Sequence, residues 1–505
     1  RPGWWWLALV GLAPLLLLAM AAPDGREAAL RAWLGGTGFF LAVNAFLVPT
    51  VGPFMVPLAM LLAALWLPLG WLVWALLGGR RRPGPWRLAA AMALVPSAFV
   101  AGEAVRSWEG LGGPWGLLGS SQWNAPALLA VAALGGVWGL SFLLVAVNVA
   151  VAAAVGRGVP AATRVVAAAA AAALPLAALA FWAWRPAPPP AGSVRVAFVQ
   201  PGVVGPVEER FQASERLSRA LPAGARPDLV AWGESSVGRD PAATPGDVAR
   251  LAAVAESAGA PVLANVDAER AGAGGGIYKS ALLVGPAGVL GSYDKLRLVP
   301  FGEYVPLRPL LGSVTRLTDA AAVDRHRGAR LAVLDAGELA VGPLVCFESA
   351  FPDLARNLAA GGADLVVVQT ADTTFQGSWG LDQHASLSAV RAVESGRPVL
   401  QAAVSGTSAA FDARGRRLAW APGSWRGAAT VELPLSGERT PYVRAGDVVP
   451  AACGLALVAG AVVAARGRLS RGGSGRRTGS TPRSRPDRPR PGATGRSRTA
   501  GRPGS

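Results

Sequence analysis

One cysteine lies in a setting suited to nucleophilic chemistry. The stretch Val341–Asp353 reads V-G-P-L-V-C-F-E-S-A-F-P-D: an apolar strand pattern comes first, and Pro352 and Asp353 are typical helix-start residues. Cys346 is therefore expected on a strand-to-helix turn, where backbone amides and the helix N-terminus favour the nucleophilic thiolate. A lone cysteine is often only a small buried hydrophobe, but Glu348 beside it argues for chemistry here.

Two further strand ends carry titratable groups. Glu234 ends the buried strand pattern D-L-V-A-W-G-E-S at 228–235, and Lys295 follows a strand that ends at Tyr293. Such a set supports acyl transfer: a carboxylate takes the thiol proton, the thiolate attacks a carbonyl carbon, and an ammonium stabilises the oxyanion. A Glu–Lys pair can equally be a surface salt bridge, and the residues alone leave that alternative open.

The lysine content is informative. Of the 48 basic residues only Lys279 and Lys295 are lysine, in a chain that otherwise uses arginine. A lysine kept where arginine is the default suggests that an amine is required, and we assign that requirement to Lys295. Lys279→Arg is expected to be nearly silent.

The composition indicates a membrane protein with a separate folded domain. The 505 residues are 52% hydrophobic and 16% charged, which is too apolar for a purely soluble chain. Much of the net charge of +17 lies in the tail 466–505, which carries twelve arginines against the single acid Asp487. Cys346 and Cys453 lie in such different contexts that neither a disulfide framework nor a metal site is expected.

Seven apolar stretches approach the ~20 residues that a helix needs to span a bilayer. They are 4–22, 34–51, 53–78, 86–104, 125–155, 162–184 and 446–465. The basic residues Arg80–Arg82, Arg157 and Arg164, together with the Arg-rich tail, place their loops in the cytoplasm. Counting spans from these loops puts 105–124 and 185–445 outside, and the first visible helix would then run inward, as if an earlier helix were missing before Arg1.

The chain changes character after a Pro-rich segment. We expect a multi-span helical domain over 1–185, a linker at 186–193, a catalytic domain at 194–445, a C-terminal membrane helix at 446–465 and a disordered basic tail at 466–505. Within 194–445, apolar strand patterns alternate with amphipathic helices, as at 194–200, 228–235, 338–346 and 364–369. This alternation predicts an α/β domain with covered sheets.

Three ordered motifs resemble a known family. W-G-E (232–234), K-L-R-L-V-P-F-G-E-Y-V-P (295–306) and C-F-E (346–348) resemble the nitrilase superfamily, and the second string, between membrane helices, resembles the apolipoprotein N-acyltransferases. R-S-W-E-G-L-G-G-P-W (106–115) and Q-H (383–384) extend the resemblance. It implies a polytopic α-helical membrane domain plus an α/β, nitrilase-like αββα sandwich.

The resemblance also implies roles for particular residues. By position, Glu234 matches the general base, Lys295 the oxyanion-stabilising lysine, Cys346 the nucleophile, Glu303 a second acid, and Phe347 and Glu348 the family's Cys-Tyr-Glu with Phe for Tyr. The implied reaction moves an acyl group from a phospholipid, through a cysteine thioester, to the N-terminal amine of a diacylglyceryl-cysteine in an apolipoprotein. It implies a multi-pass protein of the bacterial inner membrane, with a periplasmic catalytic domain and a cytoplasmic tail, and no metal, cofactor or nucleic-acid partner.

Three segments depart from the family pattern. Gly233 replaces the usual Pro, T-A-D-T-T-F-Q (370–376) stands for T-N-D-A-W-F-G, and V-S-G (404–406) stands for N-N-G. Their proximity to the expected pocket leaves the lipid or acceptor specificity open. A membrane-anchored nitrilase-type amidase or hydrolase and a degenerate non-catalytic homologue remain as alternatives.

Two histidines and the tail complete the candidates. His384 is interpreted as a structural helix residue rather than a catalytic one, and His326, in an Arg-rich loop, is expected to be exposed. The basic tail is expected to contact anionic lipid headgroups rather than nucleic acid, because it follows a membrane helix.

Overall fold

The computed structural model describes residues 3–79, 82–186, 188, 190–270, 276–305, 308–311 and 324–474. Residues up to Leu457 form one compact unit, and those from Val458 onward form a second. Arg80 and Arg81, on which part of the expected topology depends, lie outside the described residues, as do residues 475–505 of the tail.

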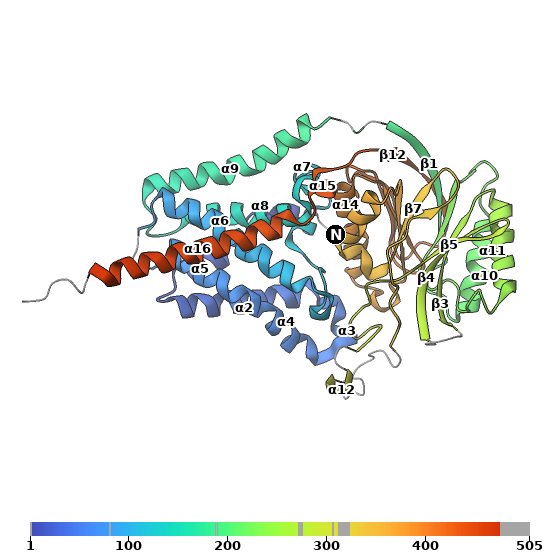
Figure 1. Ribbon diagram of the computed structural model, residues 1–505, viewed down its shortest axis with the longest axis horizontal. Coiled ribbons are helices and arrows are strands. Elements are labelled where there is room, and N and C mark those ends of the chain that lie inside the picture. Colours follow the sequence, from blue (N-terminus) through green and yellow to red (C-terminus); the bar gives the residue numbers. More distant parts are fainter. Residues whose placement is uncertain are drawn as a thin grey trace, which may run out of the picture. The chain divides into compact units, whose positions relative to one another are not determined.

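The N-terminal part is helical (Figure 1). Its α-helices are α1 (Ala13–Met20), α2 (Gly25–Val43), α3 (Val48–Val51), α4 (Met55–Ala63), α5 (Leu67–Leu77), α6 (Pro85–Arg106), α7 (Pro126–Leu129), α8 (Ala132–Val155) and α9 (Ala161–Trp184). The C-terminal α16 (Val448–Ser474) continues past the expected helix end at residue 465.

Five helices of the described part are long and apolar enough to cross a membrane: Gly52–Leu77, Pro85–Arg106, Ala132–Val155, Ala161–Trp184 and Val448–Arg466. Two of the seven expected spans differ. The first forms the shorter apolar helix Trp5–Met20. The second belongs to α2, which begins at Gly25 and therefore carries Arg26, Glu27 and Arg31 in its first turns.

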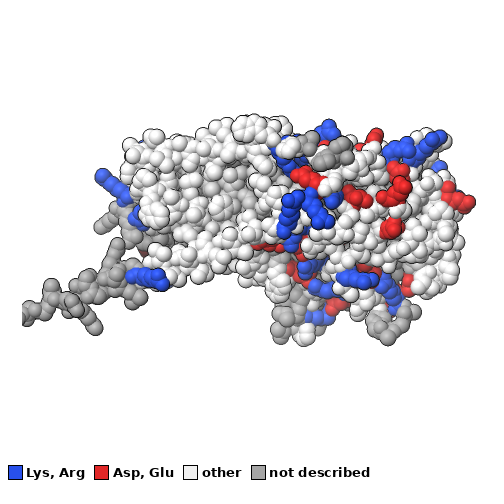
Figure 2. All heavy atoms as spheres, turned by 45° about the horizontal axis from the view of Figure 1, so that its top comes forward, with Lys and Arg blue, Asp and Glu red and all other residues white. Residues whose placement is uncertain are grey.

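On the face shown in Figure 2, few charged side chains lie over this helical part, whereas charged side chains gather over the following domain. Exposed apolar side chains include Leu34 and Leu61 at 57% and 61% exposure and Val165 at 69%. Large apolar side chains facing outward in such number are typical of lipid-facing helices.

The second part is a sandwich of two six-stranded sheets, ordered β12-β1-β2-β3-β4-β5 and β11-β10-β9-β8-β7-β6. The first sheet contains β1 (Pro190–Gln200), β2 (Leu229–Trp232), β3 (Val262–Arg270), β4 (Gly276–Gly285), β5 (Gly288–Asp294) and β12 (Gly427–Ser436). The second contains β6 (Leu334–Asp335), β7 (Ala340–Val345), β8 (Leu365–Thr370), β9 (Val399–Ala403), β10 (Ser408–Phe411) and β11 (Arg417–Ala421). The two sheets have the same pattern of a parallel centre flanked by antiparallel strands.

Helices cover both outer faces, which confirms the αββα arrangement. Helices α10 (Val207–Arg219) and α11 (Pro245–Ala258) pack on the first sheet, where Phe211 and Leu251 meet Trp232 (Figure 1). Helices α13 (Pro352–Ala360) and α14 (Gly380–Ser395) pack on the second sheet. The short α12 (Arg308–Leu311) and α15 (Pro441–Ala445) lie in connecting segments.

The sandwich and the membrane helices share one buried cluster through α14 and α8. Helix α8 is broken at Gly135 and Gly136. The carboxylate of Glu394 in α14 accepts the buried backbone N–H of Val137, directly after this break, at 2.6 Å. Trp138 donates its indole N–H to Asp447, just before α16, at 3.1 Å. Polar groups of the sandwich therefore satisfy backbone that the membrane helix leaves unpaired.

Candidate active site

Cys346 lies at a sharp turn directly after β7. Its backbone has a φ of 53°, a left-handed conformation that is uncommon for a residue with a side chain, and a short 3-10 helix over Cys346–Ala350 follows. The turn precedes α13, as the sequence pattern predicts. It directs the chain from the sheet edge into the helix and leaves the cysteine partly exposed.

Glu348 holds this turn together from inside. Its carboxylate is fully buried and accepts four hydrogen bonds: from the hydroxyl of Tyr293 (2.7 Å) and from the backbone N–H groups of Leu296 (2.7 Å), Arg297 (3.1 Å) and Val345 (2.8 Å). These donors come from both sheets. Glu348 thereby fixes the loop that carries Lys295 against the turn that carries Cys346.

Glu234 follows β2, and both of its oxygens have partners. Its backbone N–H donates to the Thr370 carbonyl at 3.1 Å, which joins the strand ends of the two sheets. Oε2 accepts the Ala371 N–H at 3.0 Å, and Oε1 lies 3.6 Å from Nζ of the fully buried Lys295. Lys295 also donates to Oε1 of Glu303 at 2.8 Å. The structure thus brings three of the expected site residues into one buried cluster.

Lys279, for which arginine is expected to be a nearly silent replacement, also lies in this cluster. Lys279, on β4, is buried, and its Nζ lies 2.7 Å from Oε1 of Glu234, closer than Lys295 does. A position on a strand opposite Asp267 of β3 is set by long-range register, which a local pattern does not reveal. The feature of the sequence that could have indicated a role for Lys279 is the rarity of lysine in this chain.

The burial of Cys346 acts against the thiolate that the turn is expected to favour. Burial raises the pKa of the Cys346 thiol well above its usual value, the negative charge of Glu234 raises it further, and Lys295 opposes both. The carboxyl of Glu234 has a pKa lowered to about 2, because Lys279 and Lys295 outweigh the effect of its burial. The resting pair is therefore a neutral thiol beside an ionised carboxylate.

His384, on α14, contacts the nucleophile turn from beneath. Its Nδ1 lies 2.8 Å from Oδ1 of Asp372, and its Nε2 lies 3.1 Å from both the Cys346 carbonyl and the hydroxyl of Ser349. Cys346, Asp372 and His384 also place possible metal-ligand atoms within 4.8 Å of one another. Both ring nitrogens of His384 already have protein partners, so a hydrogen-bonded support for the turn explains this trio. His326 is exposed, as expected, and stacks on Tyr278.

Comparison with known proteins adds independent findings. Residues 1–150 match the apolipoprotein N-acyltransferase N-terminal domain, and residues 195–440 match the carbon-nitrogen hydrolase family. An apolipoprotein N-acyltransferase of Geobacter metallireducens is 33% identical, covering 91% of this chain and 90% of the relative. One of Caulobacter vibrioides is 34% identical, covering 92% and 91%. The chain belongs to the apolipoprotein N-acyltransferase family. This confirms the resemblance seen in the motifs, and membership makes it a membrane protein.

Solved structures also match the sandwich. An amidase of the nitrilase superfamily from Nesterenkonia AN1 is 22% identical with a TM-score of 0.37, covering 52% of this chain and 96% of the amidase.

The segments that depart from the family pattern contact one another. Gln376 donates to the carbonyls of Asp372 (3.0 Å) and Ser405, so the 370–376 and 404–406 segments are joined directly. Gly233 packs so tightly that a Cβ there would lie 2.2 Å from the Val404 backbone nitrogen. A Cβ at Gly406 would lie 2.3 Å from the Asp372 carboxylate. The three segments that depart from the family pattern therefore lie together beside the cluster.

A loop between membrane helices covers the nucleophile turn. At the end of α6, Glu103 accepts the Leu118 N–H at 2.7 Å and Arg106 donates to the Trp115 carbonyl at 2.7 Å, which fixes the loop 107–118. The indole of Trp115 lies 5.2 Å from the His384 ring, and Gly113 packs against Phe347. Phe347 in turn meets Phe351 edge to face at 5.1 Å.

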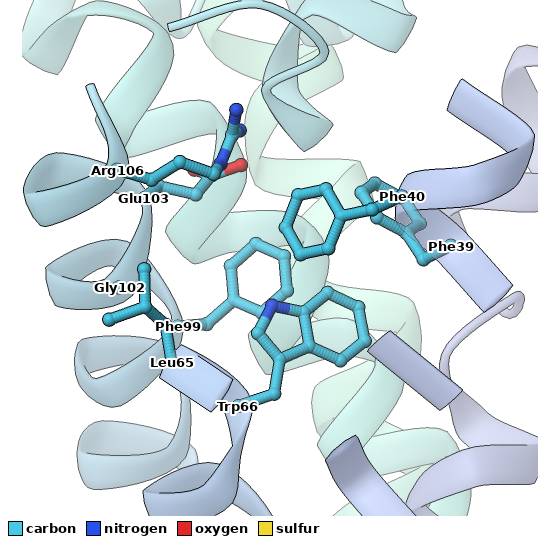
Figure 3. A pocket seen from close by; sticks show the side chains of 8 residues that line it. All are labelled: Phe39, Phe40, Leu65, Trp66, Phe99, Gly102, Glu103 and Arg106. Atoms are coloured by element: carbon cyan, nitrogen blue, oxygen red, sulfur yellow. The ribbon is translucent and has the colours of Figure 1, made fainter. Parts of the chain in front are cut away.

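Figure 3 shows Glu103 and Arg106 at the edge of a small cavity of about 10 Å³, lined by aromatic rings that face one another. The ring of Phe99 lies 5.3 Å from that of Trp66, and the Arg106 guanidinium lies 5.2 Å from the centre of the Phe40 ring. The membrane helices position Glu103 and Arg106, and these two side chains in turn fix the loop 107–118 over the nucleophile turn.

Proposed function

We propose that this protein is an apolipoprotein N-acyltransferase that works through an acyl-cysteine at Cys346. The observation that carries the proposal is the buried cluster of Glu234, Lys295 and Glu303 beside a cysteine on a strained turn, within a chain whose relatives bear that name. The donor is a membrane phospholipid, and the acceptor is the α-amine of a diacylglyceryl-cysteine at the N-terminus of an apolipoprotein.

In the first half-reaction, Glu234 takes the proton of the Cys346 thiol and the sulfur attacks the ester carbonyl carbon of the phospholipid. The Lys295 ammonium stabilises the oxyanion that forms. The C–O ester bond then breaks, and the leaving alkoxide takes the proton back from Glu234. The products are a lysophospholipid and a thioester on Cys346.

In the second half-reaction, the α-amine attacks the thioester carbon and Glu234 accepts a proton from the nitrogen. The C–S bond breaks, the amide forms, and the proton returns to the sulfur. The loop 107–118 and the membrane helices are suited to this step, because excluding water protects the thioester from hydrolysis.

We further propose that the sandwich faces the periplasm and that α16 leads into the cytoplasm, with the protein in the bacterial inner membrane. The support is the positive-inside rule, applied to Arg82, Arg157, Arg164 and Arg466, which flank apolar stretches in the sequence. The acceptor amine of a lipoprotein on the outer face of that membrane is then on the same side as Cys346.

Mass spectrometry of the purified protein in phospholipid vesicles tests the chemistry. A mass increase of one acyl chain on the peptide containing Cys346, lost when a diacylated lipopeptide is added, is the expected result. The peptide containing Cys453 should remain unmodified. An unmodified Cys346 with continued acylation of the lipopeptide would overturn the thioester mechanism.

A membrane-impermeant maleimide tests the orientation in intact spheroplasts, starting from the protein with Cys346→Ser and Cys453→Ser. A single cysteine in place of Ala242, which is exposed, should react, and one in place of Ser474 should react only after lysis. The reverse pattern would place ~30 Å of hydrocarbon between Cys346 and its acceptor and would exclude the proposed function.

A further inference from the structure

The only two lysines of this chain surround the same carboxylate oxygen. Lys279 and Lys295 lie 2.7 Å and 3.6 Å from Oε1 of Glu234, among 48 basic residues that are otherwise arginine. They reach it from neighbouring segments, since Lys279 is on β4 and the N–H of Lys295 donates to the Lys279 carbonyl at 2.9 Å. The proposed reaction gives Lys279 no role.

Three polar side chains lie within 3.5 Å of the Lys279 ammonium nitrogen. Besides Glu234, its Nζ lies 3.1 Å from the hydroxyl of Ser235 and 3.4 Å from Oδ2 of Asp267. The side chain is 9% exposed. An ammonium has three donors arranged tetrahedrally, whereas the guanidinium of an arginine is flat and larger. The geometry therefore explains why a lysine persists here in a chain that prefers arginine.

Lys279 also balances the charge of the cluster. Opposite charges alternate along Arg325, Asp267, Lys279, Glu234, Lys295 and Glu303, with successive distances of 3.1, 3.4, 2.7, 3.6 and 2.8 Å. Without Lys279, the three carboxylates of this series would keep only two of its three cations. Glu234 would then keep only Lys295, which lies closer to Glu303 than to Glu234.

We propose that Lys279 is a further positioning residue of the acyl-transfer site: it holds Glu234 in place as an anion and leaves Lys295 available to the substrate oxyanion. The inference rests on the proposed function and adds to it. Oε1 is held by Lys279 and Oε2 by the Ala371 N–H, so the orientation of the carboxylate does not depend on the lysine that must face the substrate.

The ionisation of Glu234 should respond to the loss of this cation. The charged or titratable groups that face Glu234 are Lys279, Lys295, Asp267, Glu303, Arg210, Arg325 and the thiol of Cys346. Burial raises the pKa of Glu234 and Lys279 is the first of the groups that lower it, to about 2. A neutral residue at position 279 therefore raises that pKa and makes the carboxylate protonate at higher pH.

The experiment measures the rate at which Cys346 is acylated in vesicles of phosphatidylethanolamine and phosphatidylglycerol, from pH 4 to pH 9. For Lys279→Met we expect the acid limb of the rate profile, which in wild type lies below pH 4, to move up into the measured range. We also expect the plateau rate to fall about tenfold to hundredfold because the base is less well placed. For Lys279→Arg, the acid limb should stay where it is in wild type while the plateau falls, since charge is kept and geometry is not.

Arg250→Met is the matched control. It removes a cation from the Glu208 and Glu215 pairs between α10 and α11, on the outer face of the same sheet, and should leave the profile as in wild type. A wild-type profile for Lys279→Met would overturn the inference. If that variant does not fold, Lys279→Arg decides, because a wild-type plateau would equally overturn it. Failure of the proposed function is distinct: wild type would then show no acyl group on Cys346 at any pH.

Discussion

The charged cluster at the strand ends and the polar junction at the membrane helices solve the problem of buried charge differently. In the cluster, Glu234, Lys279 and Lys295 each contact an opposite charge, and the signs alternate. At the junction, carboxylates accept backbone N–H groups: Glu103 accepts that of Leu118, and Glu394 accepts that of Val137 and also pairs with Arg391 at 2.8 Å.

The difference indicates two purposes. A base buried without compensating cations would take up a proton, so the cluster needs its full set of charges to keep Glu234 ionised. The junction needs hydrogen-bond acceptors at fixed points, because a broken membrane helix and a loop leave N–H groups that lipid cannot satisfy. Substitutions in the cluster should therefore change chemistry, and those at the junction should change how well the sandwich and the helices are joined.

The largest effect is expected at the nucleophile. Cys346→Ala removes the atom that carries the acyl group and should abolish transfer to a diacylated lipopeptide, measured by mass spectrometry of the product. Cys453→Ala, in α16 and 4% exposed, should retain activity. Equal rates for wild type and Cys346→Ala would show that the cluster does not serve this cysteine.

A slightly smaller effect is expected at Lys295. A guanidinium is too large and too flat for a fully buried site built around a compact ammonium, so Lys295→Arg should lose ~2–3 orders of magnitude in transfer rate, as for a lost oxyanion donor. Arg416→Lys, in an exposed ion pair with Asp412, should be unaffected. Comparable rates for these two variants would remove Lys295 from the mechanism.

The strand-end positions of Glu234 and Cys346 could be predicted from sequence because a buried strand and a helix start have local patterns. The alternation of strands and helices likewise predicted the covered sheets. Lys279 could not be placed, since its approach to Glu234 depends on the β3–β4 register and on the meeting of two sheets. The closing strand β12 was missed for a similar reason: its pairing with the distant β1, rather than local periodicity, defines it. The short strands β10 and β11, which pair with their neighbours in sequence, were also missed.

The contact between the membrane loop and the nucleophile turn can be tested with two adjacent glycines. A Cβ at Gly113 would lie 2.5 Å from the Phe347 ring, whereas one at Gly112 meets nothing within 4 Å. Both residues have positive φ, so both alanine variants carry backbone strain. Gly113→Ala should lower the transfer rate about tenfold more than Gly112→Ala, because the loop must move away from the turn. Equal losses would mean that strain alone, and not the contact, affects activity.

The smallest effect is expected at the junction carboxyl Glu394, and it should appear in stability rather than rate. Burial raises the pKa of Glu394 from 4.5 to about 7, although Arg391 and the Val137 N–H oppose this. Between these values the folded protein holds a proton that the unfolded chain releases, so stability should fall as pH rises from about 5 to 7.

Glu394→Gln keeps a carbonyl acceptor for Val137 but cannot titrate, and the difference in Tm between pH 5 and pH 8 should shrink. Glu209→Gln, at an exposed position of α10, should keep the wild-type difference. An unchanged difference in Glu394→Gln would show that the junction, like the cluster, holds its carboxylate charged.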